Sequence, residues 1–452
     1  MEGSNSNEGK PNLQNSLDQQ SDVPIVSEEE MEKYALLQKL NLAHEIGLDQ
    51  SFTLKKEEPP DNSLEKVVTE AVHSAFWDLF KQRISEDPPN LSMALSLLNE
   101  IKEGLYDIMM PHQTKLKSEV DEILDLDLLK QQALHGALDV MYFAQYILSV
   151  MKRLCAPIRD EKIEELSKET ELVALFRGIL ETLKLMKLDM VNFTLFSIRP
   201  ELVSNHMEYE RQKFTDYIKL SGDNLPVTEA WLKKHIKPSV NIKDVLYNAF
   251  LDLLTWDSNH PYPETLILDE KRLLKLKEEY YLMVMTATIV LLSFNSIPPQ
   301  IQSDISLKED LKQHIGLLLE GVKSDQQLSQ GIQNVIEQIK KDINDKLSSR
   351  DMNNLNDEQV TSLSQQIQQV TDLQNRVRGL VNLRVLDFLK LTLMHPGGKT
   401  NFPPALVLFK KELESLSNSF MNIVLYNINI CFEHYKKIFT KNEASSSSVS
   451  NS

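Results

Sequence analysis

The stretch that decides the fold is Leu172 to Pro200, LVALFRGILETLKLMKLDMVNFTLFSIRP, which follows a proline corner at Cys155. Apolar residues recur in it at alternating steps of four and three, which places them on one face of a helix of about 3.6 residues per turn: Leu172, Phe176, Ile179, Leu183, Met186, Met190 and Phe193. The opposite side carries Leu175, Leu180, Leu185, Leu188, Val191 and Leu195. Because apolar side chains nearly surround this helix, we expect it to run through the middle of a helical bundle and to end at Pro200, which lacks a backbone N–H.

Four polar residues form the best-defined candidate site: Arg159 in the corner before this stretch, and Asp189, Asn192 and Arg199 near its end. A carboxylate on so apolar a helix needs a partner, because an unpaired buried charge is strongly destabilising. One interpretation is a pocket in which an arginine binds a carboxylate or phosphate of a ligand. The other is a structural network of ion pairs and amide hydrogen bonds, which we favour because no nucleophile or general base stands near these residues in the sequence.

Composition predicts an all-α protein. The 452 residues are 41% apolar and 25% charged, and only 13 are glycine, while leucine-rich runs repeat with helical spacing. We expect a multi-helix bundle or array around the central buried helix, with disordered tails at both ends. The predicted organisation is a mostly disordered tail with a short helix over residues 1–62, an N-terminal helical core over 63–220, a linker over 221–241, a C-terminal helical region over 242–440, and a serine-rich disordered tail over 441–452.

The first helix of the predicted core, beginning at Ser63, has an apolar stripe of its own. Its members recur with helical spacing and are expected to face the core: Val67, Val68, Ala71, Val72, Ala75, Phe76, Leu79 and Phe80.

Charge and cysteine content limit the function classes. A net charge of −17 argues against nucleic-acid binding, which needs a basic surface. The two cysteines, Cys155 and Cys431, lie far apart, which favours a reducing compartment over a disulfide framework. The polar residues after Met1 contain no apolar segment of a secretory signal, so we expect a cytoplasmic location.

Motifs for catalysis or cofactors are weak. Gly398-Lys399-Thr400 resembles the end of a phosphate-binding loop, but Leu393 stands where the opening glycine belongs, so we predict a helix-ending turn. The histidines have no partners at zinc-ligand spacing. We therefore expect no catalytic residues, no metal and no cofactor. The longest charge-free run, Tyr280 to Ser303, invites a transmembrane interpretation, but its dense apolar part is short and favours a core helix.

One further stretch could bind a partner. A narrow aliphatic seam with helical spacing lies opposite glutamine, glutamate and lysine residues: Leu328, Ile332, Val335, Ile336, Ile339 and Ile343. Such a helix resembles those that dock the regulatory dimers of kinases by inserting into a groove. A plain core helix gives the same pattern, and we favour that interpretation.

The central block also resembles a known family. Its residues Cys155-Ala156-Pro157-Ile158-Arg159-Asp160, Phe176-Arg177-Gly178-Ile179, Met186 to Phe193, Ile198-Arg199-Pro200 and Tyr209-Glu210-Arg211 are similar in order and spacing to the t-complex protein 11 family. The likeness extends upstream through Ala75-Phe76-Trp77-Asp78 and His135-Gly136-Ala137-Leu138, and downstream through Trp256-Asp257 and Pro263-Glu264-Thr265. None of these motifs is a catalytic signature.

This resemblance implies a non-enzymatic signalling or scaffold protein that binds other proteins. It implies a link to the cyclic-AMP and protein kinase A pathway, with kinase regulatory subunits or other pathway components as partners, and to sperm function for some members. In a germ-cell-specific member the sperm flagellum or acrosomal region would be the location. Two alternatives stay open at this point: a membrane-associated receptor component, and an enzyme with an unrecognised helical site.

Overall fold

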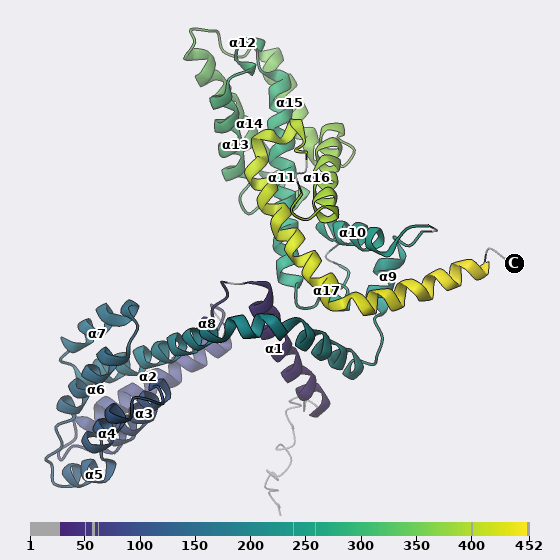
Figure 1. Cartoon of the computed structure of the whole chain (residues 1–452). Helices are drawn as coiled ribbons and strands as arrows, with labels where there is room; N and C mark the ends of the chain where they lie inside the picture. The colour runs from purple at the N-terminus through teal and green to yellow at the C-terminus, as the bar shows by residue number, and fades with distance from the viewer. Residues whose placement is uncertain are drawn as a thin grey trace, which may run out of the picture. The chain divides into compact units, whose positions relative to one another are not determined.

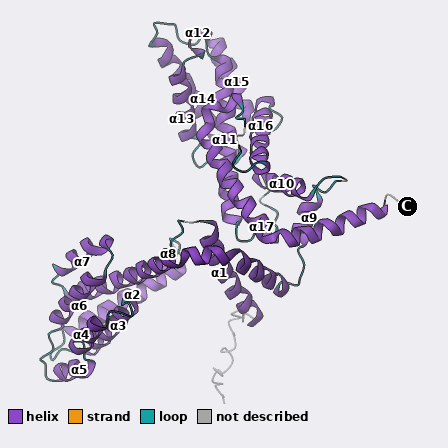
Figure 2. Ribbon diagram, in the orientation of Figure 1, coloured by secondary structure: helices purple, strands orange, loops and turns teal. Residues whose placement is uncertain are grey.

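The computed structural model describes residues 28–49, 51–56, 59–61, 63–237, 239–257, 259–398 and 401–449. Within these residues the chain forms seventeen α-helices, five short 3₁₀ helices and no strand (Figures 1 and 2). The predicted all-α fold class is therefore confirmed. Residues 1–27 of the predicted N-terminal tail (residues 1–62) lie outside the described residues, as do residues 450–452 of the predicted C-terminal tail.

Two compact units make up the described chain. Residues 50–205 form one, here called the middle unit, and the described residues up to Asp49 combine with those from His206 onward to form the other, here called the discontinuous unit. Each has its own hydrophobic core.

The middle unit is built from seven α-helices and one 3₁₀ turn of the described chain. They are α2 (Leu64–Ile84), α3 (Ser92–Ile108), α4 (Thr114–Ile123), α5 (Leu126–Leu134), α6 (Val140–Leu154), η1 (Pro157–Arg159), α7 (Asp160–Ser167) and the first part of α8 (Leu172–Leu220). Side chains at helix starts satisfy free backbone N–H groups, as where Ser63 Oγ accepts from Lys66 N and Asp139 accepts from Tyr142 N. The core holds Leu98, Ile101, Ile147, Phe176 and Ile179, all at most 2% exposed.

Helix α8 differs from the prediction in two respects. Its first turns are buried as expected, but Val191, Phe193 and Phe196 are 49%, 55% and 74% exposed, so the helix is central over only part of its length. It also continues through Pro200 to Leu220. A proline inside a helix costs about 3 kcal/mol, and buried residues of α8 on each side of Pro200, such as Phe176 and Phe214, stabilise the helix in both units.

The apolar stripe of α2 also differs from the prediction. Only Phe80 is buried, where its ring packs 5.8 Å from that of Phe176. The remaining large apolar residues of the stripe face solvent, as does the first residue of the helix: Leu64, Val67, Val68, Val72, Phe76 and Leu79. Amphipathic spacing predicts an apolar face correctly, but it does not say whether the same chain covers that face.

The discontinuous unit is built around α11 (Glu270–Ser296), against which α13, α15, α16 and α17 pack (Figure 1). Its other elements are α1 (Glu28–Leu48), the end of α8, α9 (Pro226–Lys233), α10 (Ile242–Asp252), η2 (Leu253–Thr255), η3 (Glu264–Leu266), α12 (Pro299–Gln302), α13 (Ile305–Leu318), α14 (Asp325–Ser348), α15 (Asp357–Gln368), η4 (Gln369–Thr371), α16 (Arg376–Met394), η5 (Pro404–Phe409) and α17 (Lys410–Val449). The stretch 221–241, expected as a linker, contains α9, whose Trp231 is buried. The expected C-terminal tail is helical as far as Val449.

Helix α11 contains most of the charge-free run that invited a transmembrane interpretation. Its side chains from Met283 to Val290 are buried in the protein core, as predicted for a core helix. In the part of the chain that the structure describes, no helix combines the length and the apolarity needed to cross a bilayer.

The aliphatic seam considered for partner binding lies in α14. Its six residues are at most 9% exposed and belong to the core of the discontinuous unit. The seam faces inward because α13 and α15 pack on α14. In this structure those side chains are therefore not available to a partner.

This burial predicts the effect of a charge at the centre of the seam. Ile336→Asp should lower the free energy of unfolding by more than about 3 kcal/mol, because it removes buried methyl groups and places a carboxylate in an apolar core. Urea unfolding followed by circular dichroism measures the change. The control Asn334→Asp adds the same charge on the exposed face of α14 and should stay within about 0.5 kcal/mol of the parent protein. Equal stability of both variants would contradict the buried position of Ile336.

Candidate functional site

A buried polar cluster in the discontinuous unit centres on His44 of α1. Its Nδ1 lies 2.6 Å from Glu210 Oε1 on α8, and its Nε2 lies 2.9 Å from Asp269 Oδ1 at the start of α11. All three side chains are at most 2% exposed. Since each ring nitrogen faces a carboxylate oxygen, both donate when the imidazole is doubly protonated.

The two carboxylates set the charge of His44. Burial by itself would lower the pKa of His44, but the hydrogen bonds and charges of Asp269 and Glu210 raise it to about 9. His44 is therefore a cation at neutral pH, and it compensates buried negative charge that would otherwise be strongly destabilising.

Tyr426 and Arg272 complete the cluster. Tyr426 on α17 donates its hydroxyl hydrogen to Glu210 Oε2 at 2.5 Å, so both oxygens of Glu210 are hydrogen-bonded. Burial, and then the charge of Glu210, raise the pKa of Tyr426, which keeps its hydroxyl protonated. Arg272 Nη1 donates to Asp269 Oδ1 at 3.2 Å, and Nη2 pairs with Glu45, the neighbour of His44 on α1.

Close packing accompanies these hydrogen bonds. The His44 ring meets the Tyr426 ring edge-on at 5.1 Å, and His206 stacks on the same tyrosine at 5.9 Å. A Cβ on Gly47 would overlap with the His206 ring and the Tyr426 hydroxyl. The glycine near the end of α1 is therefore required for close approach of the helix to its neighbours.

A second set of buried hydrogen bonds adjoins the cluster on α17 and begins at Asn427, the residue after Tyr426. Tyr435 donates to Asn427 Oδ1 at 2.6 Å, and Asn427 Nδ2 donates to the backbone oxygen of Thr265 at 2.7 Å. Glu264, the neighbour of Thr265, accepts from the backbone N–H of Val227 at 2.9 Å. These contacts fix η3 between α9 and α17.

The cluster has the chemistry of a structural contact that holds helices together. Within the described residues its donors and acceptors are paired with one another, apart from the buried Oδ2 of Asp269. Burial raises the pKa of the nearby Cys431 thiol, which makes it a poor nucleophile. No group of three or more histidine, cysteine, aspartate or glutamate residues suited to a metal ion occurs in the described parts of the chain.

Sequence reasoning missed this cluster. Glu210 lies in the quoted Tyr209-Glu210-Arg211 motif, but His44 is 166 positions away, in the short helix predicted within residues 1–62. Spacing along one helix cannot reveal a partner on another, so only the fold could show this contact.

The structure divides the four residues of the predicted polar site into two groups. Arg159 and Asp189 form a two-pronged ion pair, in which Nε and Nη2 each lie 2.9 Å from a different carboxylate oxygen. The pair is 22% and 23% exposed, and it links η1 to α8. Its oxygens and nitrogens face each other rather than an open pocket, which is the geometry of a structural pair.

Asn192 and Arg199 instead hold the segment before α2. Asn192 accepts from the backbone N–H of Leu54 at 2.7 Å and donates to its carbonyl oxygen at 3.0 Å. Arg199 Nη2 donates to the carbonyl oxygen of Phe52 at 2.6 Å. These two residues therefore bind backbone of their own chain along α8.

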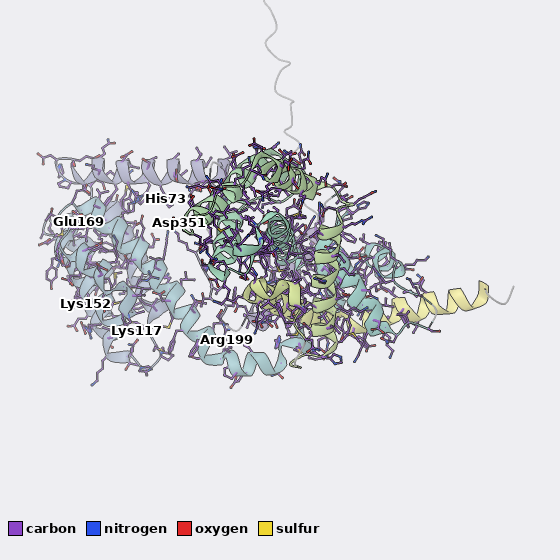
Figure 3. All side chains as sticks on the ribbon, turned by 90° about the horizontal axis from the view of Figure 1, so that it is seen from above. His73, Lys117, Lys152, Glu169, Arg199 and Asp351 are labelled. Carbon is purple, nitrogen blue, oxygen red and sulfur yellow. The ribbon has the colours of Figure 1, made fainter. Side chains whose placement is uncertain are left out.

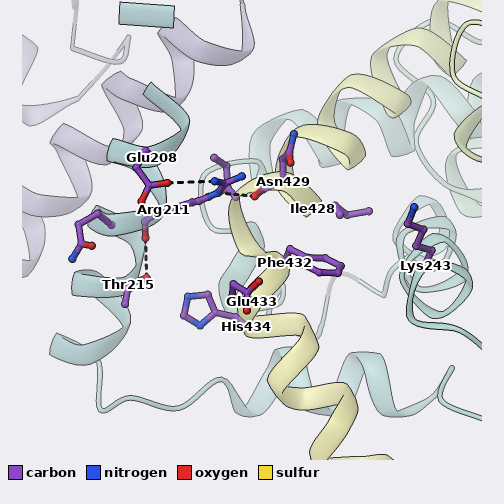
Figure 4. A pocket seen from close by; sticks show the side chains of 11 residues that line it. Glu208, Arg211, Thr215, Lys243, Ile428, Asn429, Phe432, Glu433 and His434 are labelled. Atoms are coloured by element: carbon purple, nitrogen blue, oxygen red, sulfur yellow. Dashed lines mark hydrogen bonds and ion pairs between the residues drawn. The ribbon is translucent and has the colours of Figure 1, made fainter. Parts of the chain in front are cut away.

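A surface hollow of about 560 Å³ lies between the end of α8 and α17 (Figure 4). Arg211 at its edge donates to the backbone oxygen of Asn429 at 3.0 Å and pairs with Glu208 at 3.4 Å. Burial lowers the pKa of His434, which also lines it. The arginine thus cross-links α8 and α17 at the edge of the hollow.

Comparison with known proteins agrees with the central motifs. The family model described as T-complex protein 11 matches residues 42–440. The chain belongs to the T-complex protein 11 family. The family range includes every residue of the buried cluster, from His44 to Tyr426.

Several curated members of the T-complex protein 11 family are similar along most of their length. T-complex protein 11-like X-linked protein 1 of Homo sapiens is 33% identical over 434 residues, which cover 88% of this chain and 86% of that protein. T-complex protein 11 homolog of Homo sapiens is 33% identical over 430 residues, covering 88% and 85%. T-complex protein 11 of Mus musculus is 32% identical over 409 residues, covering 83% and 72%. No solved structure matches the chain.

The charge on His44 predicts a pH dependence of stability. Its pKa is raised from 6.5 to about 9 in the folded chain, so the stabilisation is fully present below pH 6.5 and is lost as the pH rises toward 9. The loss should be on the order of 3 kcal/mol, measured by urea unfolding at a series of pH values. Subtracting the profile of His44→Gln isolates this loss from the titration of buried Cys431. Identical profiles for the two proteins would show that His44 is not a buried cation.

The Arg159–Asp189 pair predicts a difference between two similar substitutions on α8. Asp189→Asn should lower the free energy of unfolding by about 1–3 kcal/mol, because it leaves a partly buried guanidinium without its carboxylate. The control Glu181→Gln breaks an exposed pair with Arg177 on the same helix and should change it by less than about 0.5 kcal/mol. Thermal unfolding of both variants makes the comparison. Loss of partner binding by Asp189→Asn at unchanged stability would favour the ligand pocket instead.

Proposed function

We propose that this member of the T-complex protein 11 family is a non-enzymatic signalling scaffold that acts by binding other proteins. The observation that carries the proposal is the exposed apolar stripe of α2, defined by Leu64, Val68, Val72, Phe76 and Leu79. These side chains are between 40% and 79% exposed. Contiguous exposed apolar surface on a folded protein is typical of sites that bind a protein partner.

The position of α2 suits this role. Its last turns are anchored in the core of the middle unit by Phe80 and Trp77, whose rings lie 5.9 Å apart. The polar face of the helix, which includes His73 (Figure 3), lines a hollow together with Glu171, just before α8, and Arg177, near the start of α8. The helix is thus held from one side, and the apolar stripe is presented by the other.

The proposed signalling pathway is the one that resemblance to the family implies. We propose a role in signal transduction linked to cyclic AMP and protein kinase A, with the regulatory subunits of that kinase or other pathway components as partners. Since the α14 seam lies in the core, such partners would contact the α2 stripe. We propose a cytoplasmic location, and in germ cells a role in sperm function at the flagellum or acrosomal region.

Affinity capture followed by mass spectrometry tests the proposal. Val68→Asp combined with Val72→Asp places two charges on the stripe and should reduce recovery of specific partners by about tenfold or more, as loss of a central apolar contact does. Both residues are exposed, so stability should change little. The matched control, Thr69→Asp with Ser74→Asp, adds the same charge to other exposed positions of α2 and should retain the partners.

Two results would count against parts of this proposal. Equal recovery of every partner by both double variants would exclude the α2 stripe as the binding surface. If the recovered partners include no component of the cyclic-AMP pathway, the proposed link to that pathway would be rejected, and the proposed scaffold function would stand.

A further inference from the structure

A groove in the discontinuous unit is built by three of its helices. The groove has a volume of about 790 Å³ and is lined by α11, α13 and the junction of η5 with α17. Helices α13 and α17 both lie beside α11 (Figure 1), which forms the floor. On the floor and walls, Met283, Phe409 and Leu416 are nearly buried, whereas Leu317 on the rim is 61% exposed.

Gly316 leaves space in one wall of this groove. It stands in the middle of α13, where glycine lowers helix stability. A Cβ placed on it would meet no heavy atom within 4 Å, so the position has room for a side chain. The groove is therefore open where an ordinary helical residue would narrow it.

Thr286 supplies an independent sign of a missing binding partner. It is 5% exposed and lines the groove, and its Oγ1 has no hydrogen-bond partner among the described residues. Two other buried threonine and serine hydroxyls of α11 behave differently: Thr288 donates to Val284 O at 2.6 Å and Ser293 donates to Ile289 O at 2.8 Å. Buried hydroxyls are normally hydrogen-bonded, so Thr286 is placed to bond a group that enters the groove.

The dimensions of the groove floor suit a helix of a partner protein. Residues 279, 282, 283 and 286 of α11 line the groove, so its floor extends over two helical turns, or about 10 Å. An amphipathic helix that lays apolar side chains at positions i, i+3, i+4 and i+7 into such a groove is a recurring mode of recognition.

The charges around the groove indicate which charge a partner should carry. Lys312 is held within the chain, because its Nζ lies 2.5 Å from Glu412 Oε1 and 2.9 Å from the backbone oxygen of Leu408. Glu309 on the rim is exposed, and Glu279 makes only an exposed pair with Lys275 at 3.7 Å. Over the whole lining, three acids (Glu279, Glu309 and Glu412) stand against two lysines (Lys312 and Lys411), and the chain carries a net charge of −17. A basic partner is complementary to this surface.

We infer that the groove between α11, α13 and α17 binds a basic amphipathic helix of a partner protein. Its apolar residues contact Met283, Leu317 and Leu416, and one hydrogen-bonding side chain pairs with Thr286. Its lysines or arginines flank the apolar face and meet Glu279 and Glu309. The inference rests on the proposed scaffold function, and it adds a second surface and the class of segment recognised there.

Fluorescence anisotropy with the full chain and a defined probe tests this inference. The probe is a labelled 18-residue peptide of leucine and lysine with one glutamine, its leucines placed at helical i, i+3, i+4 and i+7 spacing, about five turns long. A peptide of the same composition in scrambled order controls for attraction between a basic peptide and an acidic protein. We expect the amphipathic probe to bind at least about tenfold more tightly than the scrambled one.

Two glycines of the chain provide a matched pair of variants. Gly316→Phe fills the groove and should weaken binding of the amphipathic probe by about tenfold or more. Gly331→Phe makes the same change in α14, where a Cβ would also meet no heavy atom within 4 Å, and should leave binding unchanged. If Gly316→Phe does not fold, Leu317→Lys at the exposed rim replaces it and should weaken binding in the same direction.

The outcomes separate this inference from the proposed function. Equal binding of both peptides, or equal binding by both glycine variants, would overturn the groove as a helix site. Binding of decanoate that Gly316→Phe abolishes, without binding of the peptide, would assign the groove to small apolar ligands and would also overturn it. The α2 stripe is tested separately by partner capture, so failure of the groove inference would not affect the proposed role of the stripe, and the reverse is also true.

Discussion

The discontinuous unit depends on one buried cation held between two buried carboxylates. His44 belongs to the first described helix of the chain, Glu210 to the end of α8 and Asp269 to the start of α11. Removing charged groups from water is unfavourable unless each finds a partner of opposite charge in good geometry. The cluster meets that requirement only when all three helices and Tyr426 of α17 are in place, so it specifies a single arrangement of segments that lie far apart in the sequence.

This constraint explains why residues near the N-terminus belong to the same unit as residues from His206 onward. Helix α1 has no long apolar stripe, and much of its surface is exposed. Its attachment relies on Leu40, on the His44 hydrogen bonds, and on the close approach that Gly47 permits. Specific polar contacts therefore position a helix whose apolar burial is small, which is a role for which buried charge is better suited than for raw stability.

In the middle unit, partly buried polar contacts have a similar positioning role. Arg159 and Asp189 fix the proline corner to α8, and Asn192 and Arg199 hold the backbone of Phe52 and Leu54 along the same helix. These contacts set where the chain enters α2. Together with the anchor at Phe80, they leave the apolar stripe of α2 at the surface, so a protein rich in acidic residues presents an apolar face on one unit and an apolar groove on the other.

The sequence by itself determined the elements. Heptad-like spacing and the scarcity of glycine predicted an all-α protein, the charge-free run of α11 was correctly interpreted as a core helix, and the motifs around Asp189 identified the family. Periodicity carries this information because it depends only on neighbours within one helix.

Tertiary structure decided everything that depends on contacts between helices. It decided that Pro200 lies inside α8, since packing on both sides outweighs one lost hydrogen bond. It decided that the stripe of α2 is exposed while the similar seam of α14 is buried. It also brought His44, Glu210, Asp269 and Tyr426 together. An apolar face or a lone histidine looks the same in sequence whether or not another segment covers it, and only the fold supplies that segment.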